Sequence, residues 1–246
     1  MSIDVFDFSL SKKELNSLNE YDDKVDIVHF TKNEWMHFTE EFVYNTNAIE
    51  GSTVMLEEVQ DILHKTATTD PEEIETKGVA KAIDYIRSSK EDLSLNFILK
   101  LHKFCFHGSK DFAGKFRDVE VVIRARNGTV IHAGTPVKYL KTELSNLISW
   151  YKLNKNRFKP LVLAAIIHNE FEDIHPFQDG NGRVGRLLLN FILIKNKYPP
   201  INILLMDRSE YYKTLQDYQK RNKLLPTLKF LINQYKKTLK QVTTKK

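Results

Sequence analysis

The chain has only one cysteine among its 246 residues, Cys105, so it cannot form a disulfide within itself. A single cysteine fits a reducing compartment, and we interpret Cys105 as a small apolar residue of a helix. No apolar run approaches the roughly 18 residues of a membrane span. The first ten residues carry Asp4 and Asp7 and lack the basic and apolar regions of a secretory signal. These absences predict a cytoplasmic protein without a membrane span.

Charge is plentiful in this sequence, but it is unevenly distributed. Hydrophobic residues make up 41% of the chain and charged residues 28%, as in ordinary globular proteins. The net charge is +5, yet the segment from Tyr211 to the C-terminus holds ten basic residues and one acidic residue, a charge of +9. Such a segment can contact nucleic acid. We favour a solvated helix face with a basic tail, because neither interleaved aromatic residues nor a nucleic-acid-binding motif accompanies the charge.

The segment 173–186 has a composition that no hydrophobic core requires, and it reads Asp-Ile-His-Pro-Phe-Gln-Asp-Gly-Asn-Gly-Arg-Val-Gly-Arg. Apolar residues at helical spacing precede it, and an almost wholly apolar run, 187–194, follows it. Pro176 disfavours helical geometry at His175, so one helix is expected to end there. The amides of residues 180–183 would then form the open N-terminus of the next helix, where unpaired N–H groups and the helix dipole favour a phosphate.

Two other interpretations of this segment are weaker. Residues 180–185 also satisfy the dinucleotide-binding pattern G-x-G-x-x-G, with Asp207 as the ribose-binding acid. That pattern requires a strand that runs directly into the first glycine, whereas the preceding residues have the period of a helix. His168, Glu172 and His175 could suggest a metal site on one helix face, but the segment has no H-E-x-x-H and only two widely separated histidines.

The residues from His175 to Arg186 match the pattern His-Pro-Phe-x-Asp/Glu-Gly-Asn-Gly-Arg-x-x-Arg at every defined position. This pattern resembles the signature of the Fic family. The resemblance implies an all-α, mainly helical fold, the Fic fold, with a small β-hairpin flap. It also implies an enzyme, a protein adenylyltransferase, that transfers AMP from ATP to a Tyr, Ser or Thr hydroxyl of a target protein and releases pyrophosphate.

The resemblance assigns a role to each part of the segment. His175 is expected to act as general base on the incoming hydroxyl, since the ordinary histidine pKa of about 6.5 suits that task near neutral pH. The carboxylate of Asp179 is expected to hold Mg²⁺ or Mn²⁺ at the phosphates. The residues expected to bind the nucleotide are Asp179, Gly180, Asn181, Gly182, Arg183, Val184, Gly185 and Arg186.

A second motif, Thr46-Asn-Ala-Ile-Glu50-Gly51, lies at the predicted end of a helix that begins near Trp35. On their own, Thr46 and Glu50 would be ordinary residues of a helix end. Beside the Fic signature they resemble the inhibitory motif Ser/Thr-x-x-x-Glu-Gly/Asn of the family's second class. This resemblance implies that Glu50 pairs with Arg186 and displaces it from the γ-phosphate, which restrains transfer.

Two further segments resemble the family less specifically. Gly114-Lys-Phe-Arg117 resembles the Gly-x-Tyr/Phe-Arg that precedes the flap, and Asn127-Gly128 predicts a hairpin turn. A plain structural hairpin is the alternative to a flap that covers the nucleotide and docks the backbone of the target. By resemblance, the flap strand comprises Val121, Val122, Ile123 and Arg124. Tyr211, Tyr212 and Gln219 resemble residues of the adenine pocket, although aromatic pairs also serve as packing.

We predict four segments: an N-terminal arm (1–34), a segment with the inhibitory helix packed on the core (35–66), the Fic domain (67–240) and a basic tail (241–246). Doc-like kinases have lysine where this chain has Gly182, so kinase activity is not expected. Three alternatives remain: removal of AMP, transfer of another nucleotide or phosphate-containing group, and a non-catalytic nucleotide-sensing module that binds nucleic acid. A homodimer and self-modification are compatible with the resemblance, whereas nucleic-acid and membrane binding are not expected.

Overall fold

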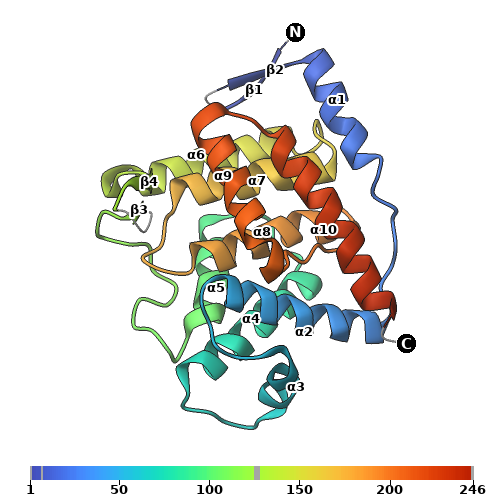
Figure 1. Ribbon diagram of the computed structural model, residues 1–246. Helices are drawn as coiled ribbons and strands as arrows, with labels where there is room; N and C mark the ends of the chain where they lie inside the picture. Colours follow the sequence, from blue (N-terminus) through green and yellow to red (C-terminus); the bar gives the residue numbers. More distant parts are fainter. Residues whose placement is uncertain (1, 7, 125–127, 245–246) are drawn as a thin grey trace.

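Ten α-helices and two small sheets make up the part of the chain that the computed structural model describes, residues 2–6, 8–124 and 128–244 (Figure 1). The mainly helical fold class predicted from the sequence is therefore confirmed. The elements are, in chain order, β1 (Ser2–Val5), β2 (Phe8–Ser11), α1 (Lys12–Asp22), α2 (Lys32–Ile49), α3 (Leu56–His64), α4 (Pro71–Ser88), α5 (Leu95–Phe106), β3 (Val122–Arg124), β4 (Val130–Ala133), the 3-10 helix η1 (Val137–Tyr139), α6 (Leu140–Asn154), α7 (Pro160–Ile174), α8 (Asn181–Lys195), the 3-10 helix η2 (Leu205–Asp207), α9 (Arg208–Arg221) and α10 (Leu225–Thr244).

Helices α7 and α8 form the centre of the fold, and nearly all of their side chains are buried. Pro160 occupies the first turn of α7, where its missing N–H breaks no intrahelical bond. Helix α7 ends at Ile174, and His175 follows in the left-handed conformation with φ 53°. Gly180, with φ 83°, directly precedes α8. The predicted junction of two helices around Pro176 is therefore confirmed.

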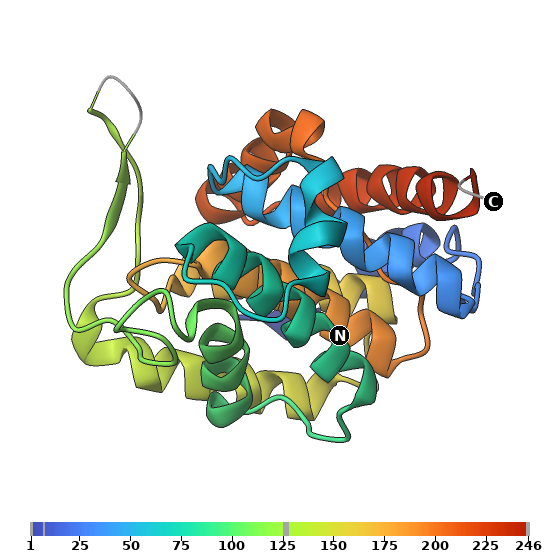
Figure 2. The same cartoon turned by 90° about the horizontal axis from the view of Figure 1, so that it is seen from below.

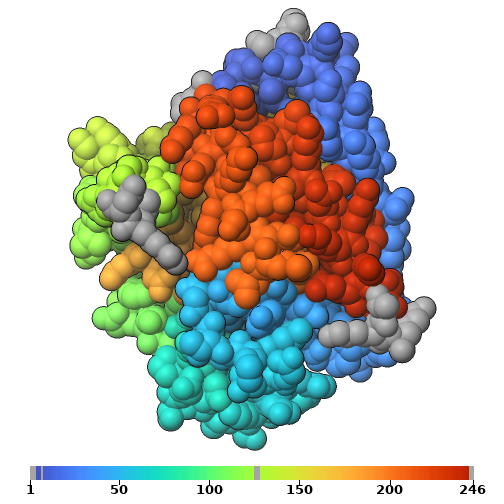
Figure 3. All heavy atoms as spheres, viewed as in Figure 1, coloured from blue at the N-terminus to red at the C-terminus, as the bar shows by residue number. Residues whose placement is uncertain are grey.

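Helices α2, α4 and α5 pack around this central pair. The side chain of Asp70 caps α4 by accepting a hydrogen bond of 3.0 Å from the backbone N–H of Glu73. Helices α4 and α5 meet at Gly78, where a Cβ atom would lie 2.3 Å from the carbonyl oxygen of Phe104. In the space-filling view, the blue to cyan segment that contains α2 and α3 borders the orange and red surface of α9 and α10 (Figure 3).

The N-terminal arm has more regular structure than its aperiodic sequence suggests. Strands β1 and β2 pair antiparallel, and Ser11 begins α1 through a reciprocal capping box with Glu14. Asp22, at the end of α1, is buried and accepts hydrogen bonds of 2.7 Å from the backbone N–H of Leu161 and from the hydroxyl of Tyr198. These bonds tie the arm to the start of α7.

Strands β3 and β4 form an antiparallel hairpin that reaches away from the helices (Figure 2). Val122 pairs with Ala133 and Ile123 with His132, after which the register shifts. Val121, expected in the flap strand, precedes β3, although its carbonyl accepts a hydrogen bond from Gly134. Of the predicted turn, Gly128 has the expected positive φ of 83°, whereas Asn127 lies outside the described residues.

One helix boundary differs from the one that the sequence predicts. Helix α2 begins at Lys32 rather than near Trp35, because Thr31 and Glu34 form a capping box. Helix α10 begins at Leu225, and Pro226 lies within its first turn, where a missing N–H breaks no intrahelical bond. In the described ranges no helix combines the length and apolar character that crossing a membrane would require.

Candidate active site

The loop between α7 and α8 is held in shape by the side chain of Asn181. Its Oδ1 accepts a hydrogen bond from the backbone N–H of Phe177, and its Nδ2 donates to the carbonyl of the same residue, both at 2.8 Å. The ring of Phe177 in turn stacks on His102, with centroids 3.8 Å apart. The resemblance implies that Asn181 binds the nucleotide. In this structure its side-chain amide forms two hydrogen bonds to the backbone of Phe177, which bridge the two ends of the loop.

His102 of α5, which sequence reasoning did not single out, is the second support of the loop. Its Nδ1 accepts a hydrogen bond of 2.8 Å from the backbone N–H of Gly114, so its Nε2 donates to the carbonyl of Asp179 at 3.1 Å. Burial lowers the pKa of His102 to about 4, which keeps the ring neutral near neutral pH. No signal in the sequence separates this histidine from an ordinary core residue.

His175 lies at the entrance to the loop with its side chain half-buried. Burial lowers its pKa to about 4, and the neighbouring charges of His132 and Arg117 act in the same direction. Its Nδ1 lies 3.4 Å from the carbonyl oxygen of Glu172, the geometry of an N–H donor. With Nδ1 protonated, Nε2 carries the lone pair, so His175 is a neutral ring that can accept a proton.

Arg117 holds the unusual backbone conformation of His175. Its buried guanidinium donates to three backbone carbonyls, those of His175 and Val119, both at 2.9 Å, and that of Thr135. The backbone N–H of Arg117 also donates to the carbonyl of Pro176 at 3.1 Å. Arg117 therefore joins the loop to both ends of the segment that carries the β3–β4 hairpin.

Asp179 and Arg183 lie together at the start of α8. One carboxylate oxygen of Asp179 accepts a hydrogen bond of 2.6 Å from Gly180 and lies 3.4 Å from Arg183. Arg183 also pairs with Glu75 of α4 and lies over the ring of Phe106, 4.3 Å from its centroid. The side chain of Asp179 is 46% exposed, so it remains accessible.

The described residues contain no group of three or more His, Cys, Asp or Glu side chains that could hold a metal ion by themselves. One accessible carboxylate fits Mg²⁺ nevertheless, because this ion is commonly held by one or two carboxylates together with substrate phosphates. Asp179 is the residue of the loop that could provide this ligand.

The N-terminus of α8 offers backbone N–H groups to an anion. Its first intrahelical hydrogen bond runs from Val184 to Gly180 at 3.0 Å, so the amides of residues 181–183 precede the helical pattern. Gly182 and Gly185 allow two acidic side chains to approach this helix. A Cβ atom at Gly182 would lie 2.2 Å from Glu50 Oε1, and one at Gly185 would lie 2.1 Å from Glu172 Oε1.

Thr46, Glu50 and Arg186 meet on the other side of this helix end. Arg186 Nη2 donates to Glu50 Oε1 at 2.7 Å and to the Thr46 carbonyl at 2.9 Å, and its Nε donates to the Thr46 hydroxyl. Burial alone would lower the pKa of Arg186, but the carboxylate of Glu50 raises it above its ordinary value. Within the described chain the buried Nη1 of Arg186 has no hydrogen-bond partner.

Behind Arg186 lies a buried polar cluster formed by Glu172, His168 and Tyr211. Burial raises the pKa of Glu172 to about 8, and Glu50 acts in the same direction against the opposing effect of Arg186. The hydroxyl of Tyr211 lies 3.0 Å from His168 Nε2, and its ring centroid is 5.8 Å from the guanidinium of Arg186. Tyr211 is therefore packed inside the protein.

The remaining predicted residues lie further from the loop. The hydroxyl of Tyr212 donates to the carbonyl of Ile49 at 3.4 Å, which places this half-buried ring at the end of α2. Gln219 lies about two turns further along α9. On the hairpin, Val122 and Ile123 are exposed, and Arg124 donates to the Gly128 carbonyl at 3.0 Å. The loop therefore contacts the Thr46–Glu50 segment, whereas strand β3 and Gln219 lie away from it.

Comparison with known proteins gives one family. The family model described as Fic/DOC matches residues 92–193, a range that includes α5, the hairpin and the whole loop. The protein adenylyltransferase Fic of Drosophila grimshawi is 29% identical over 244 residues, which cover 94% of this chain. The matched region is 49% of that relative, so the chain spans about half of its length.

Solved structures show the same fold. A Fic domain containing signaling protein from Bacteroides thetaiotaomicron has a TM-score of 0.75 at 23% identity and covers 94% of this chain and 97% of its own. IbpAFic2, which was solved covalently tethered to Cdc42, has a TM-score of 0.61 at 16% identity and covers 94% of this chain and 72% of its own. At these identities the likeness extends to the fold.

Proposed function

This chain belongs to the Fic/DOC family, and we propose that it is a protein adenylyltransferase that transfers AMP from ATP to a protein hydroxyl group. The observation that carries this proposal is the loop between α7 and α8. It presents a neutral His175 with a free Nε2 beside an accessible carboxylate and the open N-terminus of a helix. A proton acceptor beside an anion site suits the attack of a hydroxyl on a phosphate ester.

The transfer step needs few groups. The hydroxyl oxygen attacks the α-phosphorus of ATP while its proton passes to His175 Nε2. The bond from the α-phosphorus to the bridging oxygen breaks, and pyrophosphate leaves with the electron pair. The amides of residues 181–183 and the guanidinium of Arg183 are suited to hold the phosphates, and Asp179 is suited to hold Mg²⁺, which would neutralise charge on the leaving group.

We further propose that the Thr46–Glu50 segment restrains this reaction. Arg186 is only 1% exposed, and its pairing with Glu50 occupies a guanidinium that could otherwise bind the terminal phosphate of ATP. Nη1 of Arg186 has no hydrogen-bond partner among the described residues, so the guanidinium keeps an unused donor beside the one that binds Glu50. If ATP binds with its triphosphate displaced, a shift of about 1 Å can lower the rate on the order of a hundredfold.

The target is proposed to be a protein segment that pairs with the β3–β4 hairpin. The strands carry exposed apolar side chains, with Val122 48% and Ile123 41% exposed. A short exposed hairpin offers unpaired backbone groups to an extended chain. Self-modification of the chain, within a monomer or a homodimer, uses the same contacts.

Removal of AMP is the second candidate function of this site. Glu50 is 25% exposed and uses Oε1 to bind Arg186, whereas no hydrogen bond among the described residues engages its Oε2. A carboxylate oxygen beside the loop could orient a water molecule for attack on the α-phosphorus. An AMP-modified target that loses its label with the wild type, but not with Glu50→Gly, would favour this reaction.

The proposal is tested with ATP labelled at either the α- or the γ-phosphate. Wild type, Glu50→Gly and His175→Ala are incubated with Mg²⁺, each labelled ATP and a cell extract that supplies target proteins. We expect label on protein from α-labelled ATP alone, at least tenfold stronger with Glu50→Gly than with wild type and absent with His175→Ala. Glu57→Gly, a change of an exposed acid on α3, is the control that should behave as wild type.

The other results are equally informative. Label from γ-labelled ATP would show phosphate transfer and overturn the proposed reaction. Equal labelling by wild type and Glu50→Gly would remove the restraint, and transfer by His175→Ala would remove His175 as the base. An absence of label from every variant, with salt-dependent binding of DNA or RNA, would favour a binding module.

A further inference from the structure

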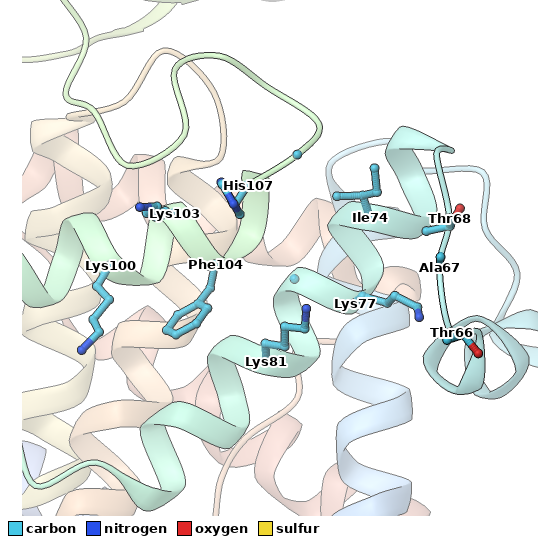
Figure 4. Close-up of a pocket in the computed structure, with 12 residues that line it drawn as sticks. Thr66, Ala67, Thr68, Ile74, Lys77, Lys81, Lys100, Lys103, Phe104 and His107 are labelled. Carbon is cyan, nitrogen blue, oxygen red and sulfur yellow. The ribbon is translucent and has the colours of Figure 1, made fainter.

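A second hollow lies apart from the loop, between α4, α5 and the segment that leads into α4 (Figure 4). Its volume is about 680 Å³, within the range of small-molecule sites. Four lysines line it, two from each helix: Lys77 and Lys81 of α4 and Lys100 and Lys103 of α5. We call this hollow the lysine pocket. Figure 4 shows Phe104 between the two pairs of lysines and Lys77 reaching toward the segment with Thr66 and Thr68.

The lysine pocket is strongly cationic. Among the described residues, no aspartate or glutamate lines it. Lys81 and Lys103 form no ion pair within the described part of the chain, and the amino group of Lys77 donates only to the Lys65 carbonyl. Lys100 is the exception, because its amino group lies 2.9 Å from Glu91 at the rim. Lys77 has an acidic neighbour in Glu73, because its charge contributes to the lowered pKa of that carboxyl group. Among the described residues, Lys81 and Lys103 therefore line the hollow without a counter-ion.

The packing of the two helices maintains this arrangement. Gly78 lets α4 and α5 approach so closely that no side chain could occupy the floor between them. Phe104, half-buried, packs against Tyr85 with ring centroids 5.2 Å apart. Lys77 and Lys81 are one helical turn apart, as are Lys100 and Lys103, so each pair lies on one helix face. The cations are therefore presented by two rigid helices.

Helix α4 separates the lysine pocket from the loop at α8. Glu75 pairs with Arg183 of the loop, whereas Lys77 lines the pocket. Residues two apart on a helix point in nearly opposite directions, so the two sites use opposite faces of α4. A ligand in the pocket would therefore not contact the residues proposed to bind ATP for transfer.

We propose that the lysine pocket binds a small anion that contains two or more linked phosphate groups. Lysine ammonium groups act as point charges for phosphate, and a phosphate chain can reach several of them at once. A single phosphate would leave cations unpaired, since the lysines come from two helices. Nucleoside triphosphates and inorganic polyphosphate share this chemistry.

The experiment uses inorganic tripolyphosphate and ATP as separate probes of the full chain. Amide signals of Gly78 and Gly108, which line the lysine pocket, and of Gly180 and Gly182 in the loop are followed by NMR during each titration. We expect tripolyphosphate to shift the Gly78 and Gly108 signals saturably. Lys81→Glu combined with Lys103→Glu should weaken this binding at least tenfold, and the corresponding double change to Gln should weaken it less.

The control is Lys152→Glu combined with Lys236→Glu, which changes the net charge equally at exposed positions on α6 and α10. This variant should bind tripolyphosphate as the wild type does. A pocket shift with ATP but not with tripolyphosphate would show that the nucleoside, and not the chain of phosphate groups, is recognised, and would overturn the proposal. No saturable shift at Gly78 and Gly108 with either probe, or equal weakening in the control, would overturn the proposal.

Discussion

Replacement of Glu172 by glutamine is expected to stabilise the protein more at pH 7.5 than at pH 5.5. The carboxyl group of Glu172 is buried behind Arg186, and its Oε1 has no hydrogen-bond partner in the described chain. Burial raises its pKa to about 8 from an ordinary value of 4.5. The folded state therefore keeps a proton on Glu172 over a pH range in which the unfolded chain has lost it.

The sign follows from this difference in bound protons. Between pH 4.5 and 8 the folded wild type holds one more proton than the unfolded chain, so its free energy of unfolding falls as pH rises. One proton corresponds to about 1.4 kcal/mol per pH unit, so the loss is roughly 2.5 kcal/mol between pH 5.5 and 7.5. Glutamine is neutral at every pH and has nearly the same shape, so this loss should be absent from Glu172→Gln.

The measurement is urea unfolding of wild type and Glu172→Gln at both pH values, with Glu57→Gln, a change at an exposed position, as the control. The difference in unfolding free energy between Glu172→Gln and wild type should grow with pH, whereas that of the control should stay constant. Parallel pH profiles for wild type and Glu172→Gln would show that Glu172 is charged in the folded state, and would refute the reasoning. Because Glu50 contributes to the raised pKa of Glu172, the loss of stability should end at a lower pH in Glu50→Gly and be smaller in total.

Two further changes test the contacts that shape the loop. The single ammonium group of lysine in Arg117→Lys cannot reach all three carbonyls that the guanidinium binds. This change should lower the free energy of unfolding in urea by roughly 2 kcal/mol. It should also lower the transfer of α-label in the Glu50→Gly background at least tenfold. Arg221→Lys, at an exposed position at the end of α9, is its control, and equal effects of the two changes would contradict a specific role of Arg117. Asn181→Asp should cost about 1–3 kcal/mol in the same unfolding assay, because a carboxylate cannot donate to the Phe177 carbonyl. Unchanged stability would show that this bond contributes nothing.

Local sequence rules predict the loop and its two helices well. Pro176 disfavours right-handed helical geometry at the preceding residue, and Gly180 supplies the left-handed conformation that starts α8. The apolar residues of α7 and α8 reveal both helices, because a helix in the centre of a fold is apolar on every side. These features depend on neighbours in the sequence, so a single sequence is sufficient to find them.

Contacts between distant residues were beyond the reach of such rules. Arg117 binds a carbonyl 58 positions away, and His102 binds one 77 positions away. The packing of the helices decides whether an arginine or a histidine lies in the core or at the site. No local pattern in the sequence specifies this packing. The only signal for Arg117 is its place in the motif from Gly114, whereas His102 has none. The β1–β2 hairpin was missed because its strands are only four residues long.

The ion pair between Glu50 and Arg186 connects residues 136 positions apart. The burial of Arg186 has two opposite consequences for this pair. A guanidinium with 1% exposure cannot be left without an anion at low cost, so Glu50 is held firmly while no competitor is present. For the same reason, an anion that replaces Glu50 gains as much from the buried cation as Glu50 does. The terminal phosphate of ATP is such an anion, and Thr46 would still hold Arg186 through its carbonyl and hydroxyl. Under the proposed function, restraint by Glu50 is therefore a competition between two anions for one cation that stays in place.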